Sequence, residues 1–334
     1  MKDQITLLDK PTENTVIFGD AVRGLQLMPD ECVDTCITSP PYFNLRDYGK
    51  DGQIGLEDSA DEYIEKLVMV FREVRRVLKP DGTLWVNIAD SYAGSGKGRL
   101  KSGEAIESTF GKINSGSRGT LEGILKKTDA NGCKPKDLIG IPWMLAFALR
   151  ADGWYLRQDI IWHKPNPMPE SVRDRCTKSH EYIFLLSKNP RYYFDSKAIQ
   201  EPANEKWASR YKSAFNCGKK ERLGCGRKNA ASNTGGLKTY TGFRNKRDVW
   251  TVAKPSYRGA HFATFPDALI TPCVLAGSKV GGVVLDPFLG SGTTLMVANK
   301  HGRNGIGIEL NDEYEQLIKD RIGEYERITA QEAQ

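Results

Sequence analysis

Four residues near the start of the chain, Ser39-Pro40-Pro41-Tyr42, have a composition that a simple turn does not require. They follow an apolar run, 33–38, that we expect to form a buried strand. Two consecutive prolines fix two φ angles and remove two backbone donors, whereas Gly or Asn turns a chain more cheaply. The segment therefore predicts a rigid platform of hydrogen-bond acceptors that faces a ligand.

A second candidate site is the glycine-rich stretch "VVLDPFLGSGTTL" (283–295) near the other end of the chain. It places Asp286 at the end of a predicted strand, before small residues that lead into a predicted helix, which suits an adenosine-bearing cofactor at the carboxyl edge of a parallel sheet. Glu309 ends the next predicted strand, where an acid can accept hydrogen bonds from both ribose hydroxyls. The loop lacks the Lys that cradles phosphates, so it favours a cofactor with a sulfonium and an amino-acid tail over ATP.

Short apolar runs alternate with helical patterns along the chain, which predicts an α/β fold. Strands are expected at 15–18, 33–38, 83–88, 154–163, 181–187, 283–286 and 304–308, and helices at 21–28, 59–79, from 142, at 292–301 and after the last strand. The clearest helix, 59–79, begins with a capping box formed by Ser59 and Glu62 and ends at Pro80-Asp81-Gly82. Because 39–42 and 286–294 both follow strand ends, we expect them to share one edge of the sheet.

The composition, with 27% charged and 39% apolar residues, is typical of a soluble globular protein. No stretch approaches the roughly 18 apolar residues of a membrane span, and the N-terminus lacks a signal-peptide pattern. Seven cysteines have no paired spacing, and four histidines form no ligand cluster. We therefore expect a reduced, cytoplasmic protein with no metal site and no membrane partner.

Positive charge is concentrated in two segments rich in Gly, Ser and Asn. Residues 97–136 carry nine Lys/Arg against four acids, and residues 203–258 carry fourteen against three, although the net charge of the chain is only +6. Basic inserts in an otherwise acidic protein indicate a polyanion-binding face. Aromatic residues interleaved in the second segment favour nucleic acid over a membrane surface. Solvated surface loops without a partner are the alternative.

The motifs "TSPPY" (38–42) and "DPFLGSGTT" (286–294) together resemble the S-adenosylmethionine-dependent DNA amino-methyltransferases, which modify adenine N6 or cytosine N4. The catalytic motif comes first and the cofactor loop last, which resembles the circularly permuted, beta-type order of that family. The resemblance covers nearly the whole chain outside the inserts. It implies a doubly wound, Rossmann-like α/β sheet, S-adenosylmethionine as cofactor and double-stranded DNA as partner.

The resemblance also implies a division of the chain. Residues 1–96 form a catalytic half with the Ser-Pro-Pro-Tyr motif, 97–136 a mobile basic insert, 137–194 the continued catalytic domain, 195–258 the target-recognition region, and 259–334 the cofactor-binding half.

Roles for individual cofactor-binding residues follow from the same resemblance. Asp20 is implied to bond the adenine amino group, Glu309 the ribose, and Asp286, Phe288 and Gly290 to line the methionine and ribose part of the pocket. The full set implied to bind the cofactor is Asp20, Phe262, Ala263, Thr264, Asp286, Pro287, Phe288, Gly290, Ser291, Gly292, Thr293, Thr294 and Glu309.

Two further segments are similar to parts of the family. "HFATFP" (261–266) resembles the segment that closes over the methionine end, and "IIWHKPNPMPES" (160–171) the strand and loop beside the target-base pocket. There His163 or Trp162 is expected near the flipped base, although Trp162 alternates with Ile160 and fits a core position equally well.

The resemblance assigns the chemistry to Ser39, Pro40, Pro41 and Tyr42. An exocyclic amino nitrogen is a poor nucleophile because its lone pair is delocalised into the ring. The Ser39 hydroxyl and the Pro40 carbonyl are expected to accept its two N–H groups, which stabilises the transition state more than the ground state. Tyr42 is expected to stack on the base once it has rotated out of the duplex.

The target base and the wider role of the protein are less constrained. Ser39 favours cytosine N4, because in this family serine at this position occurs more often with cytosine and aspartate with adenine N6. A hydroxyl serves either amine, so adenine N6 is the alternative. A non-catalytic DNA-binding protein with a methyltransferase fold is another alternative, as is methylation of RNA or of a protein glutamine. A monomer and a homodimer both fit, with a cognate restriction endonuclease as a functional partner.

Overall fold

The computed structural model describes residues 14–45, 47, 49–93, 133–134, 136–203, 242–254 and 265–330. The chain divides into a larger unit, Met1–Phe194 with Asp248–Gln334, and a smaller unit, Asp195–Arg247. Most of the predicted mobile insert 97–136 and most of the predicted target-recognition region 195–258 lie outside the described residues.

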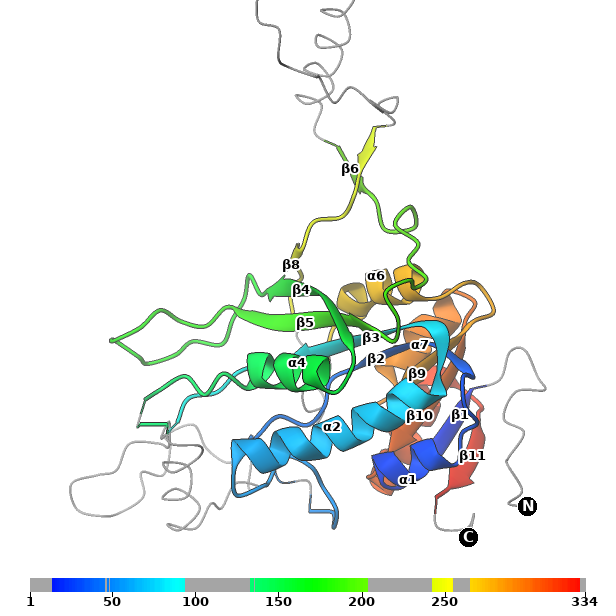
Figure 1. Ribbon diagram of the computed structural model, residues 1–334, viewed down its shortest axis with the longest axis horizontal. Helices are drawn as coiled ribbons and strands as arrows, with labels where there is room; N and C mark the ends of the chain where they lie inside the picture. The colour runs from blue at the N-terminus through cyan, green and yellow to red at the C-terminus, as the bar shows by residue number, and fades with distance from the viewer. Residues whose placement is uncertain are drawn as a thin grey trace, which may run out of the picture. The chain divides into compact units, whose positions relative to one another are not determined.

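Nine strands in the described part of the larger unit form one sheet in the order β11-β1-β10-β9-β2-β3-β5-β4-β8 (Figure 1). Neighbouring strands are parallel except around β5, which runs antiparallel to β3 and β4. The strands are β1 (Thr15–Phe18), β2 (Val33–Thr38), β3 (Leu78–Ile88), β4 (Tyr155–His163), β5 (His180–Ser187), β8 (Val249–Thr251), β9 (Val283–Asp286), β10 (Asn304–Glu309) and β11 (Glu326–Thr329). The continuous burial of β1 and β9 is typical of parallel strands covered on both faces.

Helices cover both faces of this sheet (Figure 1). One face carries α1 (Ala21–Gln26), α2 (Ala60–Val77) and α4 (Ile141–Ala151), and the other α6 (Asp267–Gly277), α7 (Thr293–Lys300) and α8 (Glu315–Ile322). Along β1, Ile17 packs in the core under α1 and α2, whereas Val16 and Phe18 pack with Leu295 and Ile318. The predicted doubly wound, Rossmann-like α/β sheet is therefore confirmed. None of the helices that the structure describes has the length and apolar character needed to cross a membrane.

The junction of α2 and β3 differs from the prediction. The Ser59 side chain caps α2 by accepting a hydrogen bond from the Glu62 backbone N–H (3.2 Å), as expected. The helix ends at Val77, however, and β3 begins immediately and includes Pro80-Asp81-Gly82, so the predicted end of the helix at these residues is wrong. The pairing of β2 with β3 shifts at this point, which accommodates a proline that has no N–H for the ladder.

Three elements of the larger unit were not predicted: α6, β8 and β11. The α6 sequence is apolar on most sides and contains Pro272, so it shows no one-sided helical pattern. β8 lies within the predicted region 195–258, yet it pairs with β4 and extends the main sheet. β11 is a four-residue edge strand beside β1.

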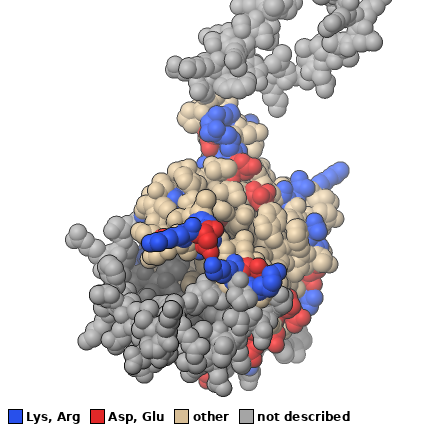
Figure 2. Space-filling model, turned by 90° about the vertical axis from the view of Figure 1, so that its left-hand side faces the viewer, with Lys and Arg blue, Asp and Glu red and all other residues tan. Residues whose placement is uncertain are grey.

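The described part of the smaller unit contains a two-stranded antiparallel ribbon of β6 (Glu201–Pro202) and β7 (Phe243–Arg244). Glu201 pairs with Arg244 (3.3 Å), Lys246 (3.5 Å) and Arg247 (3.6 Å), so one acid faces three cations. In the larger unit, Lys and Arg side chains on the described residues of the face in Figure 2 likewise lie beside Asp and Glu side chains.

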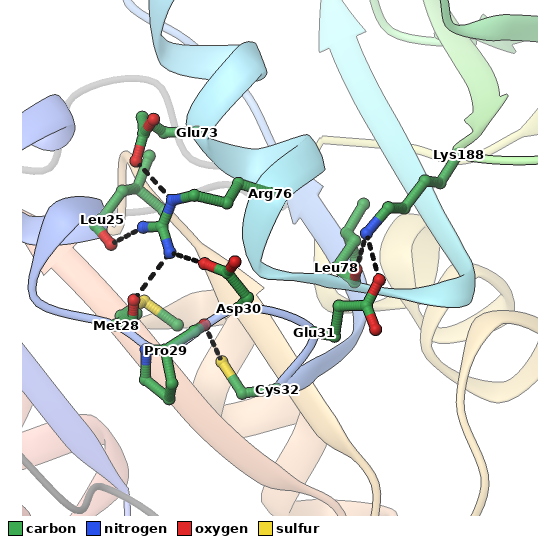
Figure 3. Close-up of polar contacts among 10 residues, drawn as sticks. All are labelled: Leu25, Met28, Pro29, Asp30, Glu31, Cys32, Glu73, Arg76, Leu78 and Lys188. Atoms are coloured by element: carbon green, nitrogen blue, oxygen red, sulfur yellow. Dashed lines mark hydrogen bonds and ion pairs between the residues drawn. The ribbon is translucent and has the colours of Figure 1, made fainter. Parts of the chain in front are cut away.

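Arg76, in the last turn of α2, holds the turn between α1 and β2 in place (Figure 3). Its guanidinium donates hydrogen bonds to the carbonyls of Leu25 (2.7 Å) and Met28 (2.9 Å) and to the carboxylates of Asp30 (2.6 Å) and Glu73 (2.8 Å). The two carbonyls lie at the end of α1, where the last carbonyls of a helix have no donor within the helix. Arg76 thus fixes the start of β2, the strand that leads to Ser39.

We expect Arg76→Ala to lower the free energy of unfolding by about 1–3 kcal/mol, because it removes charge-assisted hydrogen bonds and takes one donor from the Met28 carbonyl and one from the Leu25 carbonyl, which keeps the Met28 N–H. Urea unfolding of the two proteins measures the difference. Arg72→Ala is the matched control one turn earlier on α2, since Arg72 is 61% exposed and pairs with Asp152 at the surface. An equal loss of stability in the two variants would contradict the role given to Arg76.

Candidate functional site

The Ser39-Pro40-Pro41-Tyr42 segment leaves the carboxyl end of β2 and lines a cleft in the larger unit. The Pro41 carbonyl accepts a hydrogen bond from the hydroxyl of Tyr63 on α2 (2.7 Å), which anchors the segment to the core. Among the described residues, none donates a hydrogen bond to the Pro40 carbonyl. The first proline therefore presents an acceptor, while the second is held by the helix.

Asp286, the last residue of β9, is 1% exposed and forms the floor of the cleft. Its Oδ1 accepts hydrogen bonds from Thr38 Oγ1 (2.6 Å) and the Phe288 backbone N–H (3.0 Å), and its Oδ2 accepts one from Thr294 Oγ1 (2.5 Å). Burial raises the pKa of Asp286 to about 6, against the lowering effect of these hydrogen bonds. This carboxylate connects the strand that precedes Ser39 with the helix that follows the glycine loop.

Glu309, the last residue of β10, holds the glycine loop from the opposite side. Its Oε2 accepts a hydrogen bond from the Gly290 N–H (2.7 Å), and its Oε1 one from the Asn311 N–H (2.8 Å). Gly290 has a φ of +57°, and an added Cβ would meet no atom within 4 Å, so this backbone lines open space. Burial, followed by the charge of Asp286, raises the pKa of Glu309 to about 7 although the two N–H groups lower it.

Asp20 follows β1 and caps α1, with its Oδ1 accepting the Arg23 backbone N–H (3.0 Å). The preceding residue, Gly19, has a φ of +145°, and an added Cβ would lie 2.7 Å from the Ala330 Cβ. Its N–H donates to the Glu309 carbonyl (2.9 Å), which places Asp20 beside the end of β10. Only glycine fits between β11 and the end of β10 in this conformation.

The structure brings most of the predicted site residues to one cleft that encloses about 1180 Å³, counted out to open solvent. Those that line it are Asp20, Ser39, Pro40, Pro41, Tyr42, Asp286, Pro287, Phe288, Gly290, Thr293 and Glu309. Ser291, Gly292 and Thr294 are buried behind the cleft wall, where Thr294 binds Asp286. Phe262, Ala263 and Thr264 lie outside the described residues, whereas the next residue, Phe265, lines the cleft.

An ion pair between residues that border this cleft was not predicted from the sequence. Lys50, in the segment after Tyr42, lines the cleft and pairs with Asp312 (2.7 Å) and more distantly with Glu313 (3.6 Å), which follow β10. Hydrogen bonding to Asp312 raises the pKa of Lys50 and lowers that of Asp312. Nothing in the local sequence identifies such a contact, because it joins two segments far apart in the chain.

A buried polar network beneath Tyr42 was also missed. Glu181 at the start of β5 accepts hydrogen bonds from Tyr42 Oη (2.9 Å) and Asn87 Nδ2 (3.3 Å) on one oxygen, and pairs with Lys164 on the other. Lys164 and Glu181 are each only 8% exposed. A charged residue that opens an otherwise apolar strand, as in "HEYIFLL", is the sequence signal that could have indicated this site.

The two aromatic residues expected near a base have different surroundings. Trp162 is 2% exposed and donates from Nε1 to the Val252 carbonyl (2.8 Å), so it occupies the core position that its alternation with Ile160 allowed. Its ring supports the Lys164 ammonium, 4.3 Å from the ring centroid. His163 is half-buried, and its Nδ1 contacts Thr251 Oγ1 (3.1 Å).

Together these residues give the cleft two sets of polar groups. Buried carboxylates with raised pKa values, Asp286 and Glu309, favour a ligand that carries positive charge and hydroxyl donors, because such a ligand stabilises their ionised forms. The hydroxyl of Ser39 and the carbonyl of Pro40 offer acceptors on the same cleft wall. The arrangement suits a group transfer between a cationic, ribose-bearing cofactor and an amine.

Comparison with known proteins agrees with this geometry. The profile of the DNA methylase family matches residues 33–320. The chain is 47% identical over 307 residues to the type II methyltransferase M.SmaI of Serratia marcescens, covering 92% of this chain and 90% of that one. It is 43% identical over 309 residues to the type II methyltransferase M.Cfr9I of Citrobacter freundii, covering 92% and 87%.

Solved structures share the fold at lower identity. PvuII DNA methyltransferase (cytosine-N4-specific) superposes with a TM-score of 0.58 at 17% identity, covering 95% of each chain. TTHA0409, a putative DNA modification methylase from Thermus thermophilus complexed with S-adenosyl-L-methionine, superposes with a TM-score of 0.55 at 23% identity, covering 95% of this chain and 99% of that one. From the family match and the close relatives, the chain belongs to the DNA methylase family.

Proposed function

We propose that the protein transfers a methyl group from S-adenosylmethionine to the N4 amino group of a cytosine that is flipped out of duplex DNA. The observation that carries this proposal is the meeting of Ser39 and Pro40 with Asp286 and Glu309 in one cleft. The acceptors needed to bind an amine and the carboxylates suited to the cofactor thereby lie within reach of each other, although nearly the whole chain separates them.

The residues of the cleft fit S-adenosylmethionine. Glu309 has oxygens beside the open space at Gly290, where they can accept the ribose hydroxyls, and Asp20 lies at the adjoining strand end to accept the adenine amino group. Phe288 and the Asp286 carboxylate border the methionine part of the cleft. When bound, S-adenosylmethionine supplies an electrophilic methyl group on a sulfonium. The complex of TTHA0409 with this molecule supports the assignment.

The acceptors account for the reactivity of the amine. Ser39 Oγ and the Pro40 carbonyl each accept one N–H of the exocyclic amino group, so the nitrogen becomes pyramidal and its lone pair, no longer delocalised into the ring, points toward the methyl group. After transfer the methylated nitrogen releases one proton, which restores a neutral amine. The prolines and the Tyr63 hydrogen bond to Pro41 keep these acceptors rigid, so little reorganisation is needed during reaction. The ring of Tyr42 lines the same cleft and stacks on the flipped base.

Four observations support cytosine N4 in DNA and a restriction partner. Position 39 is a serine, and the PvuII enzyme with the same fold is named as cytosine-N4-specific. The two relatives described above are type II methyltransferases, which supports a protective role beside a restriction endonuclease. The basic segments 97–136 and 203–258 supply the charge for the DNA backbone. Adenine N6 is the second candidate, because a hydroxyl acceptor serves either amine.

Incubation of duplex DNA with the protein and S-adenosylmethionine, followed by mass spectrometry of the nucleosides, should show N4-methylcytosine. Ser39→Ala should lower the methylation rate about 10²-fold, as loss of one transition-state hydrogen bond does elsewhere, while cofactor binding by calorimetry changes little. A rise in N6-methyladenine instead would overturn the choice of base alone. DNA left unmethylated by the wild-type protein would overturn the proposed reaction.

The affinity for S-adenosylmethionine should rise with pH, since the ionised Glu309 is the better acceptor for ribose hydroxyls. With a pKa of about 7 for Glu309 in the free protein, we expect an increase of about tenfold between pH 6 and pH 8, and release of protons on binding near pH 7. The same shift, upward from 4.5, means that ionising Glu309 costs the free protein stability as the pH rises from about 4.5 to about 7.

Calorimetry in buffers of different ionisation enthalpy measures both the affinity and the proton release. Glu309→Gln is the control, since it keeps the shape of the side chain and should bind weakly with little pH dependence. An affinity that increased on acidification would contradict the role given to Glu309.

A further inference from the structure

The loop between β4 and β5, residues 164–179, lies at the same edge of the sheet as the segment 39–42. β3 is parallel to β2 and β5 is antiparallel to β3, so the end of β4 and the start of β5 meet at the carboxyl edge of β2. In Figure 1 this β4–β5 loop extends beyond the ends of both strands. It begins at Lys164, which pairs with Glu181, the residue that accepts the Tyr42 hydroxyl. The loop thus starts beside the site proposed for the flipped base.

Met168, in the middle of the β4–β5 loop, is 81% exposed, the highest fraction among the large apolar side chains that the structure describes. A single exposed apolar side chain is common and by itself indicates nothing. Here, however, it stands between Pro167 and Pro169. Each proline fixes its own φ and restricts the residue before it, so the backbone at Met168 has few alternative conformations. The apolar side chain is therefore presented to solvent on a stiff support.

Hydrogen bonds anchor the loop on both sides of Met168. Asn166 exchanges two hydrogen bonds of 3.1 Å with the backbone N–H and carbonyl of Lys254, which follows β8. Glu170 accepts a hydrogen bond from Arg175 Nη1 (2.6 Å), which joins the two arms of the loop. Contacts of the loop with itself and with its neighbours therefore hold Met168 in its exposed position.

Positive charge surrounds the exposed methionine. The loop contains four basic residues, Lys164, Arg173, Arg175 and Lys178, against two acidic ones, Glu170 and Asp174. Arg173 is exposed, as is Lys254, which is bonded to the loop through Asn166. A partner that suits both the cations and the apolar tip has an anionic surface and a stacked, apolar interior, and duplex DNA is such a partner.

Rotation of a base out of a duplex breaks its stacking and leaves a gap in the stack. Apolar side chains, methionine among them, insert between base steps in other DNA-binding proteins. Four residues separate Lys164 from Met168, so their Cα atoms are at most about 14 Å apart. A base that rotates by about 180° moves on the order of 10 Å. Met168 can therefore reach the gap while the base lies near Tyr42.

We propose that Met168 is a wedge residue, which enters the base stack of duplex DNA as the target base leaves it. This inference rests on the proposed function and adds a specific contact with the DNA to it. Because the prolines and the hydrogen bonds of Asn166 and Glu170 already order the loop, little conformational entropy is lost when the side chain inserts. Cations bind the backbone at any sequence, whereas the wedge acts only where a base has left the stack.

Methylation rates on two duplexes test this inference. In the first, a base that the protein methylates is normally paired. In the second, the same base lies opposite an abasic position. Met168→Ala should lower kcat/KM about tenfold on the paired duplex and less than about twofold on the second, because an unpaired base leaves the stack more readily. Met168→Leu should keep most of the activity, since it is apolar and of similar size, whereas the polar Met168→Gln should resemble Met168→Ala.

Fluorescence of 2-aminopurine follows the same step without the chemistry. This base analogue, placed at the target position, becomes brighter when it leaves the stack. Wild-type protein should increase the fluorescence, and saturating Met168→Ala should produce no more than about half of that increase.

Two variants control for exposed apolar side chains in general. Met69→Ala changes the same residue type, 53% exposed on α2, and Val280→Ala changes a side chain of similar exposure (77%) that precedes β9 at the opposite edge of the sheet. Both should methylate the two duplexes at wild-type rates. The Met168 variants should keep the wild-type melting temperature and cofactor affinity, since this side chain is exposed and does not line the cleft.

The outcomes separate this inference from the proposed function. A wild-type rate for Met168→Ala on the paired duplex would overturn the wedge and leave the reaction intact. Equal losses on the two duplexes would do the same, because they would indicate a contact that is independent of base rotation. A wild-type protein that methylated neither duplex would overturn the proposed function, and the inference with it.

Discussion

The site depends on the buried carboxylate of Asp286, because this group is bonded to both parts of the cleft. Thr38 at the end of β2 and Thr294 at the start of α7 donate to its two oxygens. The acceptor segment begins one residue after Thr38, and the glycine loop begins one residue after Asp286. The carboxylate therefore fixes the separation between the acceptors and the cofactor loop, which belong to opposite ends of the sequence. Neighbouring parallel strands β2 and β9 make this possible, since their carboxyl ends lie at one edge.

The electrostatics of the cleft contrast with those of the basic segments. Asp286 and Glu309 are buried acids whose pKa values rise to about 6 and about 7, so the free protein bears a desolvation cost in its binding site. Strongly perturbed acids of this kind are typical of sites whose ligand offsets the cost. The positive charge lies instead in 97–136 and 203–258, where nine and fourteen cations are found. The buried acids of the cleft and the concentrations of positive charge thus belong to different parts of the sequence.

Much of the fold and part of the site could be predicted from the sequence. Strand ends are marked by local patterns, so the positions of Ser39, Asp286 and Glu309 at one sheet edge followed from hydrophobic runs alone. The capping of α2 by Ser59 is likewise a local signal. β8 was not predicted, because a three-residue strand in a basic segment is too short to show a hydrophobic periodicity.

The polar contacts within the site were harder to foresee for a different reason. The pairing of Lys164 with Glu181 depends on the antiparallel register of β4 with β5, in which His163 lies opposite His180. That register is set by packing of both strands against the core, and a shift of one residue would place Glu181 on the other face of the sheet. Long-range side-chain contacts of this kind follow from the fold and not from the local sequence.

The presence of a buried Lys164–Glu181 ion pair is better explained by the side chains that it contacts than by a contribution to the free energy of folding. Replacing a buried ion pair with apolar residues of similar size is often neutral or stabilising by about 1–4 kcal/mol, so such a pair does not persist for the free energy of folding alone. Here each member provides what the next one requires. The Trp162 ring supports the ammonium of Lys164, the ammonium pairs with Glu181, and the Glu181 carboxylate accepts the hydrogen of Tyr42. An apolar pair would fill the same volume but would leave the Tyr42 hydroxyl without its acceptor on Glu181.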